Sequence, residues 1–153
     1  MDFNVQEAQP HHLAYIVSFQ KAMALETEQI HLDEITLTKG VDAVLKAIEK
    51  GIYYLITDNF ENPVACCLTT YEWSDWRNGT VLWIQSLYVV PEFRRKGIFK
   101  FLYSYLQEKV KQSPDLKGIR LYVDKRNKMA YNAYKAAGMN NEHYEMFEWI
   151  PSF

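Results

Sequence analysis

One stretch of the chain joins a strand pattern to a helix pattern. It runs from Trp83 to Val110 and reads W-I-Q-S-L-Y-V-V-P-E-F-R-R-K-G-I-F-K-F-L-Y-S-Y-L-Q-E-K-V. Its spacing predicts a buried strand, a turn at Pro91, a basic loop with one glycine, and an amphipathic helix. The unbonded amides and the dipole of a helix N-terminus attract anions. The stretch therefore predicts a phosphate site at residues 94–100, with a plain solvated loop as the alternative.

The composition is that of an ordinary globular protein. The chain has 153 residues, of which 48% are hydrophobic and 24% charged, and its net charge is −2. General nucleic-acid binding needs a concentrated cationic face, so it is not expected. No apolar run is long enough to span a membrane, and the N-terminus lacks the pattern of a signal peptide. These features predict a cytoplasmic protein without nucleic-acid or membrane partners.

The chain offers no obvious metal or disulfide site. His11 and His12 are adjacent and would face different directions on a helix, so a metal pair is not expected there. Cys66 and Cys67 are neighbours within an apolar strand pattern, where adjacent side chains point to opposite faces. We interpret both as reduced thiols of the core.

Hydrophobic periodicity predicts an α/β (α+β) fold in one domain, residues 1–153. Strands are expected over residues 2–7, 52–58, 64–72, 81–90 and 118–123, and again in the tail with Tyr144, Met146, Phe147 and Trp149. Helices are expected from Pro10 to about Glu26, along Val41, Val44, Leu45 and Ile48 with Gly51 as C-terminal cap, from Ile98 to before Pro114, and from Asn127 to Gly138. A tight hairpin turn is expected at Asn78 and Gly79. The order is β-α-α-β-β-β-α-β-α-β, in a mixed central sheet of about six to seven strands with strands four and five parallel.

An acidic segment, L-E-T-E-Q-I-H-L-D-E, follows the first predicted helix and contains Glu26, Glu28, Asp33 and Glu34. It fits either a solvated helix end or an acidic rim that attracts a cationic substrate. Trp73 and Trp76 add aromatic faces that also attract ammonium groups. The segment therefore favours, without requiring, a cationic substrate.

Two segments resemble the GNAT superfamily of N-acetyltransferases. The segment L-Y-V-V-P-E-F-R-R-K-G-I-F-K-F-L is similar to its acetyl-CoA signature, a hydrophobic strand, Pro-x-x-R-x-x-x-G-x-[GA], and a helix. The pyrophosphate loop of that family falls on Arg94, Gly97 and Phe99, where Phe99 replaces a small residue. A second segment, N-K-M-A-Y-N-A-Y-K-A-A-G-M, resembles N-x-x-A-x-x-x-Y-x-x-x-G-[FM] of the same family.

The resemblance implies a role for each part of the cofactor site. Strands four and five splay, and the pantetheine arm of acetyl-CoA lies between them on the backbone of Leu87, Tyr88 and Val89, with the amide of Tyr88 as oxyanion donor. The loop that holds the pyrophosphate consists of Arg94, Arg95, Lys96, Gly97, Ile98, Phe99 and Lys100. Asn127 contacts the cofactor from the last helix. Tyr134 is the general acid for the departing CoA thiolate, with a plain core ring as the alternative.

The acceptor side is less defined by sequence. The hairpin Y-E-W-S-D-W-R-N-G is locally similar to that of polyamine (diamine) acetyltransferases, which carry a Glu on the following strand where this chain has Gln85. The amine proton could leave through water or through Glu26, Glu28 or Glu72, and Trp73 is a further candidate for acceptor contact. Direct attack in a ternary complex is expected rather than a covalent cysteine intermediate.

These features predict an acyltransferase that moves acetyl from acetyl-CoA to a primary amine of a small molecule or peptide. Two alternatives are a CoA or acetyl-CoA sensor of the same fold without turnover, and an unrelated phosphate-binding fold. The resemblance is also compatible with a homodimer.

Overall fold

The computed structural model describes residues 2–151 of the chain. They divide into two compact units between Leu121 and Tyr122. The first unit contains every strand of the described chain and three of its α-helices; these are β1 (Asn4–Glu7), α1 (Leu13–Glu28), α2 (Glu34–Lys46), β2 (Ile52–Thr57), β3 (Pro63–Ser74), β4 (Gly79–Val89), α3 (Ile98–Gln112) and β5 (Leu116–Leu121). Two short 3-10 turns, η1 (Pro10–His12) and η2 (Pro91–Phe93), precede α1 and follow β4. The second unit contains α4 (Lys128–Ala136). One domain over residues 1–153 stays a prediction.

The first unit is built on a mixed sheet with strand order β1-β2-β3-β4-β5. β1 to β4 pair antiparallel in succession, and β4 pairs parallel with β5 across the α3 connection. The predicted α/β class, the mixed sheet and the parallel fourth and fifth strands are therefore confirmed. The strand number is corrected, because residues 2–151 form five strands rather than six to seven.

The missing strand is the one predicted in the tail. Residues 144–151 adopt neither helix nor strand. Tyr144 and Met146 alternate with polar neighbours as a strand would, but Met146 and Phe147 are adjacent, as are Trp149 and Ile150. An alternating pattern shows only that a segment fits a pleated sheet, whereas a strand also needs a partner edge.

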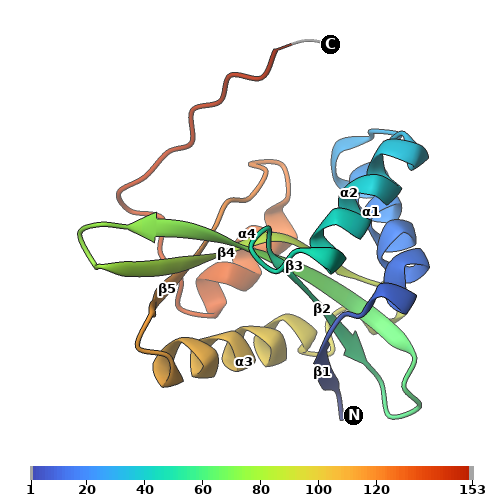
Figure 1. Ribbon diagram of the computed structural model, residues 1–153, viewed down its shortest axis with the longest axis horizontal. Helices are drawn as coiled ribbons and strands as arrows, with labels where there is room; N and C mark the ends of the chain where they lie inside the picture. The colour runs from blue at the N-terminus through green and yellow to red at the C-terminus, as the bar shows by residue number, and fades with distance from the viewer. Residues whose placement is uncertain (1, 152–153) are drawn as a thin grey trace. The chain divides into compact units, whose positions relative to one another are not determined.

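Helices cover both faces of the sheet in the first unit (Figure 1). On one face α1 and α2 bury a core that includes Ile16, Val41, Leu55, Cys66 and Tyr88. On the opposite face α3 buries Leu102 and Leu106 against Ile56, Cys67 and Ile84. Adjacent Cys66 and Cys67 thus enter different cores, and both are free, buried thiols, as the sequence predicted. None of the helices within residues 2–151 is long and apolar enough to cross a membrane.

The second helix differs from its prediction at its C-terminal end. Its N-cap is Asp33, whose Oδ2 accepts a hydrogen bond of 2.8 Å from the Thr36 amide, and the helix ends at Lys46. Ile48, expected in the apolar stripe, is 67% exposed in the turn that follows. Gly51 is therefore not the helix cap. Its φ is +151°, and a Cβ there would lie 2.5 Å from the carbonyl oxygen of Thr69, so the close approach to β3 requires glycine.

The hairpin between β3 and β4 is confirmed, but its turn is longer than predicted. Residues 75–78 form the turn, with amide hydrogen bonds from Arg77 to Ser74 and from Asn78 to Asp75. Asn78 has a positive φ of 45°, whereas Gly79 is the first residue of β4. Ser74 and Gly79 form the last pair of the two strands, so four residues connect them instead of the two of a tight hairpin turn.

Candidate acetyl-CoA site

The site lies where β4 extends beyond the end of its partner β5. The two strands pair from Thr80 and Leu116 to Ile84 and Leu121, and the pairing stops there. β4 then continues along β3 as far as Val89, which lies opposite Ala65. Residues 85–89 therefore have no partner from β5, as expected if strands four and five splay.

A β-bulge marks the point of separation. Ile84 lies opposite Thr69 and Ser86 lies opposite Leu68, which leaves Gln85 as an extra residue in β4. A bulge bends its strand and disrupts the ladder locally. The bulge residue comes immediately after the last residue of β4 that pairs with β5, so it coincides with the start of the open edge.

The hydrogen-bonding alternation decides which amides face the open edge. The Val90 amide donates to the Val64 carbonyl at 3.0 Å, so these opposed residues form a hydrogen-bonded pair. In an antiparallel ladder such pairs alternate, which turns the Tyr88 amide toward Cys66 on β3. The amides of Leu87 and Val89 consequently point away from β3. The Tyr88 amide, expected to be the oxyanion donor, therefore faces β3, and the identity of that donor stays a prediction.

The open edge leads into the N-terminus of α3. Gly97 is the N-cap residue, with φ +81° and no side-chain cap, and the first intrahelical bond runs from the Phe101 amide to the Gly97 carbonyl at 2.9 Å. The amides of the first helical turn, residues 98–100, consequently have no intrahelical acceptor. A Cβ added at Gly97 would meet no atom within 4 Å, so open space lies over the loop. This arrangement fits a pyrophosphate.

Three cations of the loop reinforce that fit. Arg95, Lys96 and Lys100 are exposed around the helix end, where the helix dipole also favours negative charge. Ile98 is buried in the α3 core and anchors the first turn. The ring of Phe99 stacks on Tyr103, one turn along the helix, with centroids 5.7 Å apart. The larger residue at this position therefore packs along α3.

Arg94 differs from these cations, because its side chain is bonded to β4 and α1. Its Nε donates to the Val89 carbonyl at 3.0 Å, and its Nη2 donates to Oε2 of Glu26 on α1. The guanidinium also lies over the ring of Tyr88, 5.7 Å from the centroid. Burial and then the negative charge of Glu26 raise the pKa of Tyr88. Sequence reasoning did not anticipate this cluster, because Glu26 and Arg94 are 68 residues apart.

The predicted acidic rim is largely engaged in other contacts. Glu26 pairs with Arg94, and Glu34 pairs with Lys21. Asp33 caps α2, and the hydrogen bonds from the amide and side chain of Thr36 lower the pKa of its carboxyl group. Glu28 is the last residue of α1 and is exposed. The four carboxylates therefore do not form one uniform surface.

A polar cluster crosses three strands on the face that carries α1 and α2. Glu72 on β3 forms an ion pair with Arg120 on β5 and accepts a hydrogen bond of 2.7 Å from Nε1 of Trp83 on β4. Beside it, the Thr70 hydroxyl donates to Oε1 of Gln85 at 3.2 Å. The sequence had indicated Glu72 and Gln85 but not Arg120 or Trp83. The available signal was an arginine within an otherwise apolar end of β5, which indicates a partner carboxylate.

Trp73 does not join this cluster. It follows Glu72 directly on β3, so the two side chains point to opposite faces of the sheet. Trp73 is 65% exposed. The predicted acceptor residues are therefore divided between the two faces.

The second unit contains the other predicted cofactor residues. Asn127 is the N-cap of α4, and its Oδ1 accepts a hydrogen bond of 3.1 Å from the Ala130 amide. Gly138, with φ +86°, follows the C-cap, and the Met139 amide donates to the Tyr134 carbonyl. Both predicted ends of this helix are confirmed. Tyr134 lies on its last turn.

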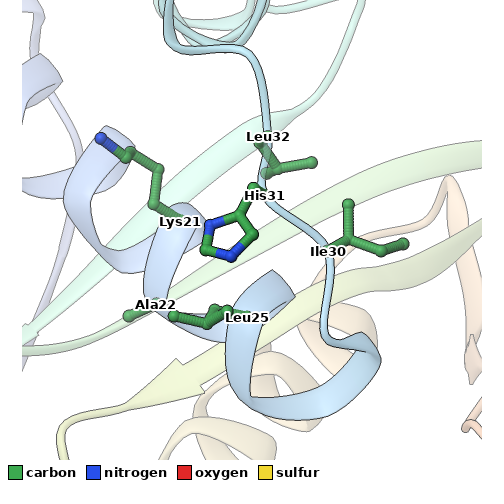
Figure 2. A pocket seen from close by; sticks show the side chains of 6 residues that line it. All are labelled: Lys21, Ala22, Leu25, Ile30, His31 and Leu32. Carbon is green, nitrogen blue, oxygen red and sulfur yellow. The ribbon is translucent and has the colours of Figure 1, made fainter.

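A small pocket lies at the end of α1, close to the acidic segment (Figure 2). Its lining is mostly apolar and consists of Lys21, Ala22, Leu25, Ile30, His31 and Leu32. Gln29, with φ 57°, ends α1 and turns the chain into this connection. Figure 2 shows the His31 imidazole on the connecting segment, on the side of the helix that carries Ala22 and Leu25. The pocket is therefore local to the α1–α2 connection.

An open strand edge can bind an extended amide chain, and the helix N-terminus that follows it can bind a phosphate group. Together they favour a protein that binds a phosphorylated ligand with an amide arm. Residues 19–139 match the model of the acetyltransferase (GNAT) family. The chain belongs to this family: it is an acetyltransferase, and acetyl-CoA is its cofactor. Comparison with curated proteins gives no match.

Solved structures agree with this assignment. A possible acetyltransferase from Clostridium difficile 630 is 42% identical, covers 99% of each chain and superposes with a TM-score of 0.90. The aminoglycoside 6'-N-acetyltransferase AAC(6')-Ih from Acinetobacter baumannii is 13% identical, with a TM-score of 0.75 over 99% of this chain and 100% of that one. Aminoglycoside N-acetyltransferase AAC(6')-Iy, solved in complex with CoA, is 12% identical, with a TM-score of 0.77 over 99% and 96%. The two aminoglycoside enzymes are similar in fold alone.

Proposed function

We propose that the protein transfers the acetyl group of acetyl-CoA to a primary amine of a small molecule or peptide, by direct attack in a ternary complex. The observation that carries this proposal is the continuity between the open edge of β4 and the N-terminus of α3. The edge offers the amides of Leu87 and Val89 to the pantetheine arm. The helix end offers unbonded amides and the cations Arg95, Lys96 and Lys100 to the pyrophosphate.

Acetyl-CoA supplies an activated thioester. An amide of Leu87 or Val89 would polarise its carbonyl as an oxyanion donor. The amine nitrogen bonds to the carbonyl carbon, the carbon–sulfur bond breaks, and the sulfur takes a proton. We assign that proton to Tyr134, on the support of the segment Asn127–Met139. Phenols and thiols have solution pKa values of about 10 and 8.5, so transfer from a phenol to a thiolate is chemically reasonable.

The acceptor's own proton is assigned to water. Glu26 and Glu72 are held in ion pairs with Arg94 and Arg120, and the amide of Gln85 cannot act as a base. An alkylamine has a pKa of about 10.4, so only a small neutral fraction can attack at neutral pH. kcat/KM is therefore expected to rise about tenfold per pH unit between pH 6 and 9. A plateau within that range that vanishes in Glu28→Gln would instead assign the base to Glu28.

A covalent cysteine intermediate has no support. Cys66 and Cys67 are fully buried, and burial raises the pKa of both thiols. A reactive cysteine needs access to its substrate and an accessible thiolate. Direct attack is therefore the simpler route.

A cationic acceptor is favoured by Glu28, which is exposed at the end of α1. A panel of acceptors should accordingly include polyamines, aminoglycosides and lysine peptides, with neutral amines as controls. Acetyl transfer is detected by release of free CoA thiol and by mass spectrometry of the product. Retention of full acceptor KM values in Glu28→Gln, across all cationic members, would contradict a role for this carboxylate.

A second candidate is a CoA or acetyl-CoA sensor without turnover. Gln85 is the observation that favours it, because this bulge residue stands where the polyamine enzymes carry a Glu. The same panel separates the two functions. Tight acetyl-CoA binding by calorimetry without acceptor-dependent thiol release identifies the sensor, whereas acceptor-dependent release identifies the enzyme.

A further inference from the structure

We propose that Arg94 is a positioning residue for the open edge of β4, held there by Glu26, and that its guanidinium is not a ligand of the pyrophosphate. This inference rests on the proposed acetyl transfer, since it assigns how the donor's arm is aligned. It separates two roles within one loop: Arg94 orders the strand, while its neighbours supply the positive charge. Glu26 thereby becomes part of the cofactor site rather than of the acceptor rim.

The contacts of Arg94 hold its side chain against β4 and α1. Its Nε is bonded to the Val89 carbonyl at 3.0 Å, its Nη2 to Glu26, and its plane lies over Tyr88. Tyr88 is in turn packed against Phe19 of α1, with ring centroids 5.4 Å apart. The guanidinium is therefore fixed on three sides by β4 and α1. Arg95 and Lys96, by contrast, are exposed.

The ion pair of Arg94 supports the same separation of its role from that of the exposed cations in the loop. Glu26 and Arg94 form a neutral pair in which each side chain is only about one-third exposed, at 39% and 35%. Moving Arg94 onto a phosphate would leave the Glu26 carboxylate unpaired and close to a second anion, which is unfavourable. The exposed Arg95, Lys96 and Lys100 can approach a phosphate without such a loss.

The bond to Val89 shows what the positioning achieves. Because Val89 belongs to a pair that is not hydrogen-bonded to β3, both its N–H and its carbonyl face the open edge. Arg94 occupies that carbonyl, so the Val89 amide is the group that remains for the ligand. A charged donor on the carbonyl also fixes the orientation of the residue. The open end of β4 thus presents a donor at a defined angle.

The decisive experiment compares acetyl-CoA with acetyl-pantetheine, a donor that lacks the pyrophosphate. Arg94→Gln and Glu26→Gln are each expected to lower kcat/KM about tenfold with both donors, because the arm loses its alignment in either case. Lys96→Gln is expected to raise KM about tenfold for acetyl-CoA, with its effect confined to that donor. If Arg94→Gln impaired only acetyl-CoA, Arg94 would be a phosphate ligand and the proposal would be wrong.

Further variants separate positioning from general loss of structure. Glu108→Gln removes the exposed ion pair with Lys111, away from the site, and serves as the control for loss of a salt bridge. In the double variant of Glu26 and Arg94, the two effects should not add, because both act through one contact. Full additivity would contradict the coupling.

The inference can also be judged if no amine is acetylated, an outcome that would remove the proposed function. Titration with pantetheine, followed by the NMR signals of the Leu87 and Val89 amides, then replaces turnover. Arg94→Gln and Glu26→Gln should raise the Kd for pantetheine at least fivefold, and Lys96→Gln should raise only the Kd for CoA. An unchanged pantetheine Kd in Arg94→Gln would overturn the inference independently of the reaction.

Discussion

Nε1 of Trp83 donates a hydrogen bond of 2.7 Å to Oε2 of Glu72, while Arg120 holds the other oxygen of the same carboxylate. Side chains from β4 and β5 thus bind the same carboxylate on β3. The carboxylate is about one-third exposed, so its partners matter more than those of a fully solvated surface pair. Glu72 is therefore a structural member of the sheet.

Glu72→Gln is expected to lower the free energy of unfolding by about 1 kcal/mol, because one ion pair and one hydrogen bond weaken together. Urea denaturation measures this change, and Arg120→Gln should give a similar one. Turnover of Glu72→Gln should stay within a few-fold of the wild type. A fall of more than about a hundredfold, without loss of acetyl-CoA binding, would instead identify Glu72 as the general base.

Gly97→Ala is expected to weaken CoA binding at least tenfold. The residue has φ +81°, and its bare backbone borders the space proposed for the pyrophosphate. An alanine at this φ also costs about 1–2 kcal/mol of stability. Gly40→Ala is the matched control, since Gly40 lies within α2 with open space around it and should gain about 0.5–1 kcal/mol. Calorimetry and urea unfolding measure the two effects; equal CoA affinity in both variants would contradict the loop assignment.

Tyr134→Phe is expected to lower kcat about a hundredfold while leaving the Kd of CoA nearly unchanged, because only the acidic hydroxyl is removed. Tyr131→Phe, on the same helix, is the control and should keep wild-type turnover. The comparison is made under saturating acetyl-CoA. Unchanged turnover in Tyr134→Phe would exclude it as the acid and favour a plain packing role for the ring.

Asp33 predicts a pH dependence of stability. Its pKa in the folded chain is lowered by the bonds from Thr36, so its contribution is fully present above the unfolded value of about 3.9. That contribution is lost as pH falls through the folded pKa. Urea unfolding at pH 6 and pH 3 should therefore show Asp33→Ala and wild type converging at the lower pH. A constant difference between them at both values would show that ionisation of Asp33 is not involved.

Local chemistry made part of this structure predictable. The two ends of α4 could be predicted, because the side-chain cap of Asn127 and the positive φ of Gly138 are properties of single residues. The strand–loop–helix around Gly97 and the pairing of β3 with β4 follow from periodicity in the same way. Such signals act over one or two turns of chain, which is why they could be read from the sequence.

Several other relationships depend on contacts between residues that are far apart in the sequence. Gly51 was assigned to a helix end, but its conformation is set by the approach to Thr69 on β3. Glu26 was considered part of an acidic rim, and its ion pair with Arg94 in the loop before α3 could not be predicted from the sequence. The Tyr88 amide was expected to be the oxyanion donor, but the pairing of β4 with β3 turns this amide toward Cys66. Sequence periodicity contains none of these relationships.

The extra residue in β4 has a consequence for insertions and deletions. Without Gln85, Ile84 opposite Thr69 would be followed directly by Ser86 opposite Leu68, and the ladder with β3 would be regular. A bulge bends its strand, so a strand without the bulge would continue straighter past Ile84. Removal of one residue would thus change the direction in which the amides of Leu87 and Val89 are offered to the cofactor arm. We therefore expect substitution of Gln85 to be tolerated, whereas its deletion should lower the activity.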